Sequence, residues 1–156
     1  MLPYLKTWSL FIVNFEYFVL FCLVQVMMDV SSQIAFFSFK LSRQPGHEIL
    51  QNGCQVYLGS VRSDGYCHIT YTNAVGTKTS ISAQRAALMV ARNNKLPRVL
   101  QASHLCQEKR CINPDHLNLE ANVINNQRKF CASQNRCSGH RGYPACVNLG
   151  MLHIFL

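Results

Sequence analysis

The sequence predicts a small α+β domain with an antiparallel sheet and two structural zinc sites, preceded by an apolar helical segment. Three observations lead to this prediction. Alternating residues and turn signals follow one another between residues 55 and 81, as in short antiparallel strands. Cysteines and histidines are concentrated between residues 104 and 146, at the short spacings of zinc-binding loops. Residues 1–39 are apolar and contain a single basic side chain, Lys6.

Length and charge favour one domain with a polyanionic partner. The chain has 156 residues, which fits a single domain with additional sequence. Its formal net charge is +8, and every Lys and Arg except Lys6 lies between residues 40 and 141. A concentrated basic region favours nucleic acid as the partner, and a basic surface without such a partner is the alternative.

The chain divides into three parts by composition. An apolar N-terminal segment covers residues 1–39, the predicted domain covers residues 46–147, and an apolar tail covers residues 148–156. Ser42–Gly53 contains the chain breakers Pro45, Gly46 and Gly53 and is predicted to be a linker.

The N-terminal segment allows several interpretations. Ser9–Met28 has the length of a transmembrane helix and follows Lys6, but three polar residues interrupt it. The segment is therefore a candidate signal peptide or membrane anchor, although no clear cleavage site follows it. The other interpretation is a non-functional extension, such as a misplaced start of the reading frame. The interrupting residues are Asn14, Glu16 and Gln25.

Three strands are predicted in the first half of the domain. Gln55–Arg62 is followed by the turn signal Ser63-Asp64-Gly65, and Tyr66–Thr72 then alternates in character. A turn at Asn73–Gly76 leads to a third strand at Thr77–Ile81.

Helical signals follow these strands. Ser82 is a suitable N-cap for a helix through Ala83–Asn93. Arg98–Ser103 is predicted to be a short strand, and Asn118 to cap a second helix over Leu119–Lys129.

The eight cysteines favour metal binding over disulfide bonds. A disulfide framework does not require histidines, yet three histidines lie beside the clustered cysteines. Cys106, Cys111 and His116 place three ligands on one compact loop, as a structural zinc site needs. A second, self-contained set of four ligands is Cys131, Cys137, His140 and Cys146.

These motifs resemble a known family. The segment Ser103-His104-Leu105-Cys106, the segment Cys111-Ile112-Asn113-Pro114-Asp115-His116-Leu117, Asn125 and the second Cys/His cluster are similar to the His-Cys box homing endonucleases. Members of this family are zinc-stapled ββα-metal (HNH-like) nucleases. The resemblance covers residues 46–147 and implies a ββα-metal core.

The resemblance also implies the remaining zinc ligand. The family takes the fourth ligand of the first zinc from a cysteine upstream, at the start of the sheet. Cys54 opens the first predicted strand and is our choice, and Cys67 is the competitor. The second cluster is spaced less tightly than in the family, around its histidine and last cysteine.

The resemblance assigns three catalytic residues. His104 is implied to be the general base for hydrolysis of double-stranded DNA, and Asn125 to hold a single Mg²⁺. A basic residue of the sheet is implied to contact the phosphate, and Lys78 is the positional match to an arginine in the family. The alternatives for His104 are a structural histidine or a zinc ligand in place of His116.

The resemblance further implies that the strand ribbon lies in the DNA major groove. One face of the ribbon presents side chains that suit base edges, with basic residues nearby. Two arginines of the first helix are expected to meet phosphates, and the apolar tail to support a weak homodimer. The predicted DNA contacts are Arg62, His68, Thr70, Thr72, Lys78, Arg85 and Arg92.

Three functions are therefore considered. The first is a homing-type DNA endonuclease that acts in the nucleus or elsewhere inside the cell. The second is a zinc-stapled nucleic-acid-binding module that has lost cleavage. The third is a secreted or membrane-tethered cysteine-rich protein, which the apolar residues 1–39 favour and which would contact a membrane.

Overall fold

The computed structural model describes residues 30–43, 46–73 and 75–147. The chain divides into two compact units, Met1–Gln33 and Ile34–Leu156. The predicted membrane-length run and the apolar tail lie outside the described residues. Within the ranges that are described, no helix combines the length and apolarity needed to cross a bilayer.

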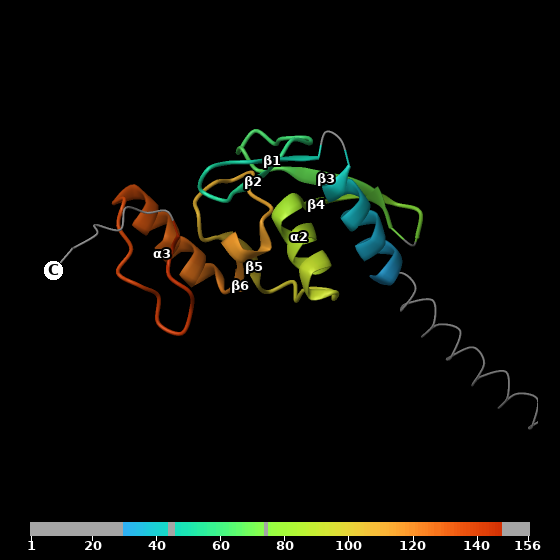
Figure 1. Ribbon diagram of the computed structural model, residues 1–156. Coiled ribbons are helices and arrows are strands. Elements are labelled where there is room, and N and C mark those ends of the chain that lie inside the picture. The colour runs from blue at the N-terminus through green and yellow to red at the C-terminus, as the bar shows by residue number, and fades with distance from the viewer. Residues whose placement is uncertain (1–29, 44–45, 74, 148–156) are drawn as a thin grey trace, which may run out of the picture. The chain divides into compact units, whose positions relative to one another are not determined.

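The strands of the second unit form three separate two-stranded antiparallel sheets. This arrangement confirms the predicted α+β class with antiparallel pairing, in the form of three small sheets and not one (Figure 1). The pairs are β1 (His47–Ile49) with β2 (Gln55–Tyr57), β3 (His68–Thr72) with β4 (Lys78–Ser82), and β5 (Gln101–His104) with β6 (Leu117–Glu120).

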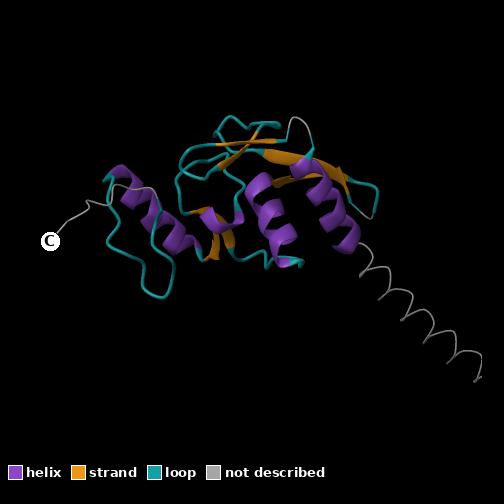
Figure 2. Ribbon diagram, in the orientation of Figure 1, coloured by secondary structure: helices purple, strands orange, loops and turns teal. Residues whose placement is uncertain are grey.

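Helices pack against these sheets. Residues 34–42 are helical, and α2 (Ala83–Arg92) follows β4 directly. The short 3₁₀ helix η1 (Pro114–His116) precedes β6, and α3 (Asn122–Ser133) follows it. In Figure 2 the strands β1–β4 lie along one side of α2 and of the helical residues 34–42.

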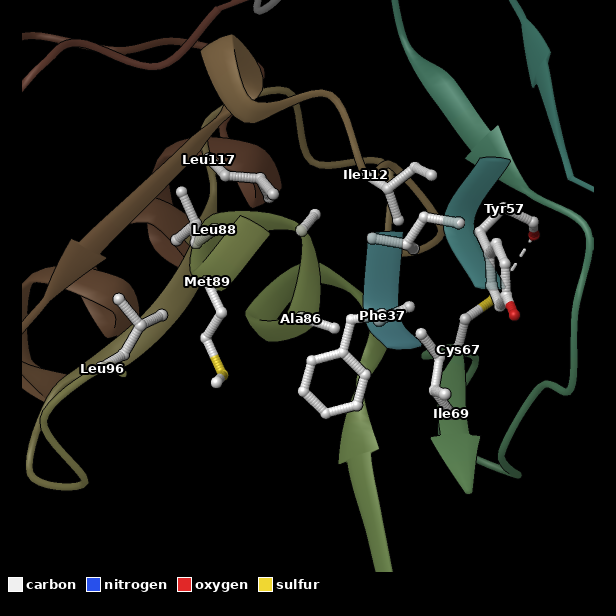
Figure 3. Packing of buried hydrophobic residues seen from close by; sticks show 13 residues of the cluster. Phe37, Tyr57, Cys67, Ile69, Ala86, Leu88, Met89, Leu96, Ile112 and Leu117 are labelled. Carbon is white, nitrogen blue, oxygen red and sulfur yellow. Dashed lines mark hydrogen bonds between the residues drawn. The ribbon is translucent and has the colours of Figure 1, made fainter. Parts of the chain in front are cut away.

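The main hydrophobic core joins the helices to β3. Phe37 is fully buried and meets Tyr71 edge-on, with 5.2 Å between ring centroids. Figure 3 shows Phe37 between side chains of α2 and β3. Burial of this apolar surface is the main favourable contribution to folding. The other buried members include Leu41, Cys67, Ile69, Ala86, Leu88, Met89, Leu96, Ile112 and Leu117.

The alternation predicted for the ribbon is present. Ile69 of β3 is buried and Tyr71 is half-buried, whereas Thr70 and Thr72 are exposed. Thr70 pairs with Ser80 and Thr72 pairs with Lys78, so this face of the β3–β4 hairpin is polar. Side chains at every second position share a face, which places the predicted base-reading residues together.

The second predicted helix begins later than the sequence suggested. Leu117–Glu120 is a strand, β6, and α3 starts at Asn122. Leu117 is buried in the core, and Glu120 is fully buried and bound to Arg128 and Ser103. These tertiary contacts outweigh the capping signal of Asn118, since local propensity is a weak determinant.

The N-terminal boundary also differs from the predicted one. The second unit begins at Ile34, and Phe37 and Leu41 belong to its core, although residues 1–39 were assigned to a separate segment. The predicted linker Ser42–Gly53 contains β1, whose backbone pairs with β2.

Replacing Phe37 by Ala should therefore destabilise the whole domain. We expect a loss of about 3–5 kcal/mol in the free energy of unfolding, measured by denaturant titration of the full chain, because a buried aromatic ring leaves a cavity. Phe39→Ala on the same helix is the matched control, since Phe39 is 48% exposed. The control should cost roughly 0.5–1 kcal/mol. Equal losses would show that residues 34–42 do not pack as described.

Candidate metal centres and the adjoining cavity

The first Cys/His cluster consists of Cys54, Cys106, Cys111 and His116. Its four ligand atoms lie within 4.8 Å of one another. His116 Nδ1 is 3.4 Å from Cys54 Sγ and 3.8 Å from Cys111 Sγ. Tetrahedral zinc with ordinary bond lengths needs separations of roughly 3.6–3.8 Å between sulfur and nitrogen or sulfur ligands. Both the donor atoms and their spacing therefore fit structural zinc.

Backbone pairing brings this cluster together. Tyr57 N donates to Arg110 O at 2.9 Å, and Ile112 N donates to Gln55 O at 2.8 Å. The loop that carries Cys111 is thus held along β2, directly after Cys54. Because the ligands come from segments far apart in the sequence, a bound metal would tie the first sheet to the loop.

A short motif positions the histidine ligand. Asn113 Oδ1 accepts from Asp115 N at the start of η1, where Pro114 occupies the first turn. Asn113 Nδ2 also donates to Gly53 O at 2.8 Å, which fixes η1 against the segment before Cys54. The Asn-Pro-Asp-His sequence therefore both forms the turn and directs His116 into the cluster.

The structure places Cys54 in the cluster and Cys67 elsewhere. Cys67 is fully buried in the main core, where its Sγ donates to Tyr57 O at 3.5 Å (Figure 3). Because Cys67 lies in this core, it packs as a small hydrophobic residue and is not a member of the first cluster.

The three thiols of the first cluster shift one another's pKa values. Burial raises the pKa of the Cys54 thiol to about 11. A hydrogen bond between Cys106 and Cys111 raises the pKa of Cys106 and lowers that of Cys111 to about 5. The thiols alone thus favour a single shared thiolate. A divalent cation supplies the charge that lets all three ionise, because the thiolate is the metal-binding form.

The second Cys/His cluster consists of Cys131, Cys137, His140 and Cys146. His140 Nε2 lies 3.7, 3.5 and 3.4 Å from the sulfur atoms of Cys131, Cys137 and Cys146, respectively. These separations also match a tetrahedral zinc site. The looser spacing of this cluster therefore does not prevent its four donors from converging.

Hydrogen bonds around the second cluster orient its ligands. His140 Nδ1 is 3.4 Å from Gln127 Oε1, which accepts from Nδ1–H and leaves Nε2 free for a metal. The backbone N–H groups of Gly139 and Cys146 each donate to Cys137 Sγ at 3.4 Å. Such donors stabilise a thiolate ligand.

His104 and Asn125 line the same cavity, which has a volume of about 760 Å³. The cavity lies between the β3–β4 hairpin, β5 and α3. Cationic side chains surround it, so it suits an anionic ligand. These are Arg62, Arg85, Arg98, Lys109 and Lys129.

His104 is held as a neutral imidazole. Its Nε2 lies 3.0 Å from Cys111 O, and a carbonyl oxygen only accepts hydrogen bonds, so Nε2 carries the proton. Nδ1 therefore keeps the lone pair. His104 is 7% exposed, and burial lowers its pKa, which favours the neutral form. The ring of Tyr66 covers it, with centroids 5.8 Å apart.

Asn125 presents an amide oxygen on the first turn of α3. Its Nδ2 donates to Gln101 Oε1 at 2.6 Å, which fixes the orientation of the amide group. Oδ1 then faces away from Gln101. A hard cation such as Mg²⁺ prefers oxygen ligands and often takes only one or two from the protein, so Asn125 fits that requirement.

The structure does not bring Lys78 to this cavity. Lys78 pairs with Thr72 at one end of the β3–β4 hairpin, whereas Ser82 at the other end lines the cavity. Arg62 does line the cavity, and its side chain is 59% exposed beside Asp64 at 3.1 Å. The hairpin register thus separates Lys78 from the cavity that His104 and Asn125 line.

Arg85 is engaged in a structural role that the sequence did not indicate. Its guanidinium donates to three backbone carbonyls of the turn after α2, at 2.6–2.9 Å. The predicted phosphate contact of Arg85 would compete with these bonds. Arg92 is exposed at the end of α2 and is not among the residues that line the cavity. The three carbonyls belong to Leu96, Pro97 and Leu100.

Sequence reasoning missed other cations beside His104. Lys109 lies between the zinc ligands Cys106 and Cys111, and its Nζ is 5.5 Å from the Tyr66 ring centroid and 2.9 Å from Asp64 O. The position of Lys109 in the loop that follows His104 could have indicated from the sequence that it lies near this histidine. Among the predicted base readers, His68 is half-buried, and its Nδ1 has no hydrogen-bond partner among the described residues.

The fold and the two clusters define a zinc-binding α+β domain with a histidine and an asparagine on one cationic cavity. Residues 45–148, well over half of the chain, match the family described as the zinc-binding loop region of homing endonuclease, and the chain belongs to that family. No curated protein and no solved structure matches the chain.

Metal analysis of two cysteine variants tests the first cluster. After dialysis of the full chain against a chelator of moderate strength, we expect two zincs in the native protein and one in Cys54→Ser. Cys67→Ser is the matched control and should retain two, since its sulfur lies in the core. Elemental analysis gives the metal content. Loss of zinc in the Cys67 variant with none lost in the Cys54 variant would reverse the assignment.

Proposed function

We propose that the protein is a Mg²⁺-dependent endonuclease that hydrolyses phosphodiester bonds in double-stranded DNA. The observation that supports this most strongly is the shared cavity of His104 and Asn125, with cations around it. Family membership supports a nuclease-type domain in general, and the finer activity rests on the geometry of the cavity. A DNA substrate implies action in the nucleus or elsewhere inside the cell.

His104 is proposed to act as the general base. Its Nδ1 holds the lone pair because Nε2 is bound to Cys111 O. A neutral imidazole near pH 7 can take a proton from a water molecule that attacks phosphorus. The first metal centre would support this role indirectly, since Cys111 is a donor of that cluster and its carbonyl fixes the tautomer.

Asn125 is proposed to hold the Mg²⁺ through Oδ1. When bound, Mg²⁺ would stabilise the negative charge that develops on the phosphate and on the leaving oxygen. Asn125 itself only binds and orients. Gln101 keeps its amide in the required orientation through the 2.6 Å hydrogen bond.

Arg62 and Lys109 are proposed to bind the phosphate. Both line the cavity near the Tyr66 ring that covers His104. The Arg62 guanidinium can make two parallel hydrogen bonds to a phosphate, which Lys78 could not. Breaking the exposed ion pair between Arg62 and Asp64 costs little, because surface ion pairs contribute about 0–1 kcal/mol.

The polar face of the β3–β4 hairpin is proposed to contact the DNA groove. Thr70, Thr72 and Lys78 are exposed on this face. Ser82, which lines the cavity, lies at the end of the same hairpin. A duplex along the ribbon would thus reach the cavity. Any dimer needed to cut both strands would involve the tail, residues 148–156, which lies outside the described residues.

A binding module without cleavage is the second candidate. It is favoured by the low exposure of His104, 7%, because water must reach Nδ1 for catalysis. Cleavage therefore requires that water reach Nδ1 from the cavity that His104 lines. An assay of plasmid nicking decides between the two candidates.

The His104→Ala variant should lose nicking of supercoiled plasmid, by roughly 100- to 10,000-fold, because the general base is removed. Its zinc content and duplex affinity should match the native protein, since His104 belongs to neither cluster. Asn125→Ala should also lose nicking activity, and a higher Mg²⁺ concentration should partly restore that activity. Undiminished cleavage by the His104 variant would rule out this base.

Arg62→Ala and Lys78→Ala form a matched pair of variants. Both remove one exposed cation, so both should weaken duplex binding slightly. Only Arg62→Ala should lower kcat, by roughly 100-fold, if its guanidinium stabilises charge at the scissile phosphate. Single-turnover nicking rates at saturating protein measure this. A larger effect from Lys78→Ala would contradict the assignment.

A further inference from the structure

A buried ion pair joins β6 to α3. Glu120 and Arg128 are 0% and 1% exposed. Arg128 Nε lies 2.8 Å from Glu120 Oε1, and Arg128 Nη2 lies 2.8 Å from Glu120 Oε2, so the contact is bidentate. Of the two ion pairs found in the described ranges, only this one is buried.

The pair belongs to a longer network of hydrogen bonds. Ser103 Oγ donates to Glu120 Oε1, and Asn118 Nδ2 donates to Oε2 at 2.9 Å. On the other side, Arg128 Nη1 lies 3.7 Å from Cys146 Sγ, a donor of the second cluster. The carboxylate thus receives four donors, and the guanidinium lies between this carboxylate and the sulfur of Cys146.

The network reaches both residues of the proposed active site. Ser103 immediately precedes His104 on β5, and Arg128 follows Asn125 by about one turn on α3. The side chains of His104 and Asn125 come from different elements. The spacing between them therefore depends on what fixes α3 against β5.

We propose that Glu120 and Arg128 are positioning residues that set the placement of Asn125 relative to His104 and link it to the second metal centre. This inference rests on the proposed nuclease function. The metal donor Cys146 would orient Arg128, Arg128 would orient Glu120, and Glu120 would hold β5 through Ser103.

Stability alone does not account for the pair. Burying two charges carries a large desolvation cost, and well-packed apolar residues of similar volume are often equally stable. Apolar residues, however, lack directional hydrogen bonds. Four donors on one carboxylate define one geometry, and a 1 Å displacement of a catalytic group can reduce a rate by roughly 100-fold.

The double variant Glu120→Leu/Arg128→Met of the full chain separates the two roles. It removes both charges together, so no unpaired charge is left buried. We expect two bound zincs, a native-like melting temperature and an unchanged KM for duplex. We expect kcat to fall by roughly 100-fold. The His104 imidazole resonances in a ¹H–¹⁵N spectrum should also shift, because β5 loses its contact with Glu120.

Two comparisons complete the design. Glu48→Gln removes a carboxylate from exposed β1 and should change neither kcat nor the His104 resonances. If the double variant fails to fold, Ser103→Ala and Arg128→Lys probe the same network. Each deletes part of it and keeps the other bonds. Each should lower kcat with KM unchanged.

Native kcat together with unshifted His104 resonances in a folded variant would overturn the inference and leave the pair a structural element. The spectrum also separates this inference from the proposed function. If the native protein nicks no plasmid, the nuclease proposal fails. In that case, shifted His104 resonances in the double variant would still support the positioning role of Glu120 and Arg128. Unshifted resonances would exclude that role.

Discussion

The convergence of three thiols and an imidazole in the first cluster is the constraint on which the rest of the domain depends. Cys54 precedes β2, and the other donors come from the loop between β5 and β6. Each two-stranded sheet is marginal alone. A coordinated cation would cross-link the β1–β2 sheet to the loop between β5 and β6 and allow the buried thiols to ionise. The same loop carries the Cys111 carbonyl that fixes the tautomer of His104.

The second cluster and the buried ion pair extend this constraint to α3. His140 and Cys146 belong to the segment that follows α3. Arg128 of α3 contacts both Cys146 and Glu120 of β6 and so connects this segment to β6. The proposed base and the proposed Mg²⁺ ligand therefore lie on elements that bound metals and the buried ion pair would hold in place. A small domain gains rigidity in this way where apolar burial is limited.

Much of this arrangement could be predicted from the sequence. Ligand spacing predicted the second cluster and three members of the first, because zinc coordination restricts donor type and distance. The choice of Cys54 as the fourth member came from the family resemblance. Alternation predicted the polar face of β3–β4. The sequence did not reveal β6, because Asn118 is a typical N-cap and predicted a helix from Leu119. The contact of Glu120 with Arg128 forms only in the folded structure and is not visible in the sequence. The sequence named Lys78 as the phosphate contact and did not show that Arg62 lines the cavity of His104, because that depends on which end of the hairpin packs near His104.

X-ray absorption at the zinc edge of the full chain tests the central claim most directly. Two Cys₃His centres predict an average of three sulfur ligands at about 2.3 Å and one nitrogen at about 2.0 Å per zinc. This average should persist in His104→Ala. In His116→Ala, one of the two zincs should lose its imidazole nitrogen and take a water oxygen in its place, with the sulfur count unchanged. A coordination shell rich in oxygen, or a chain without zinc, would contradict the account.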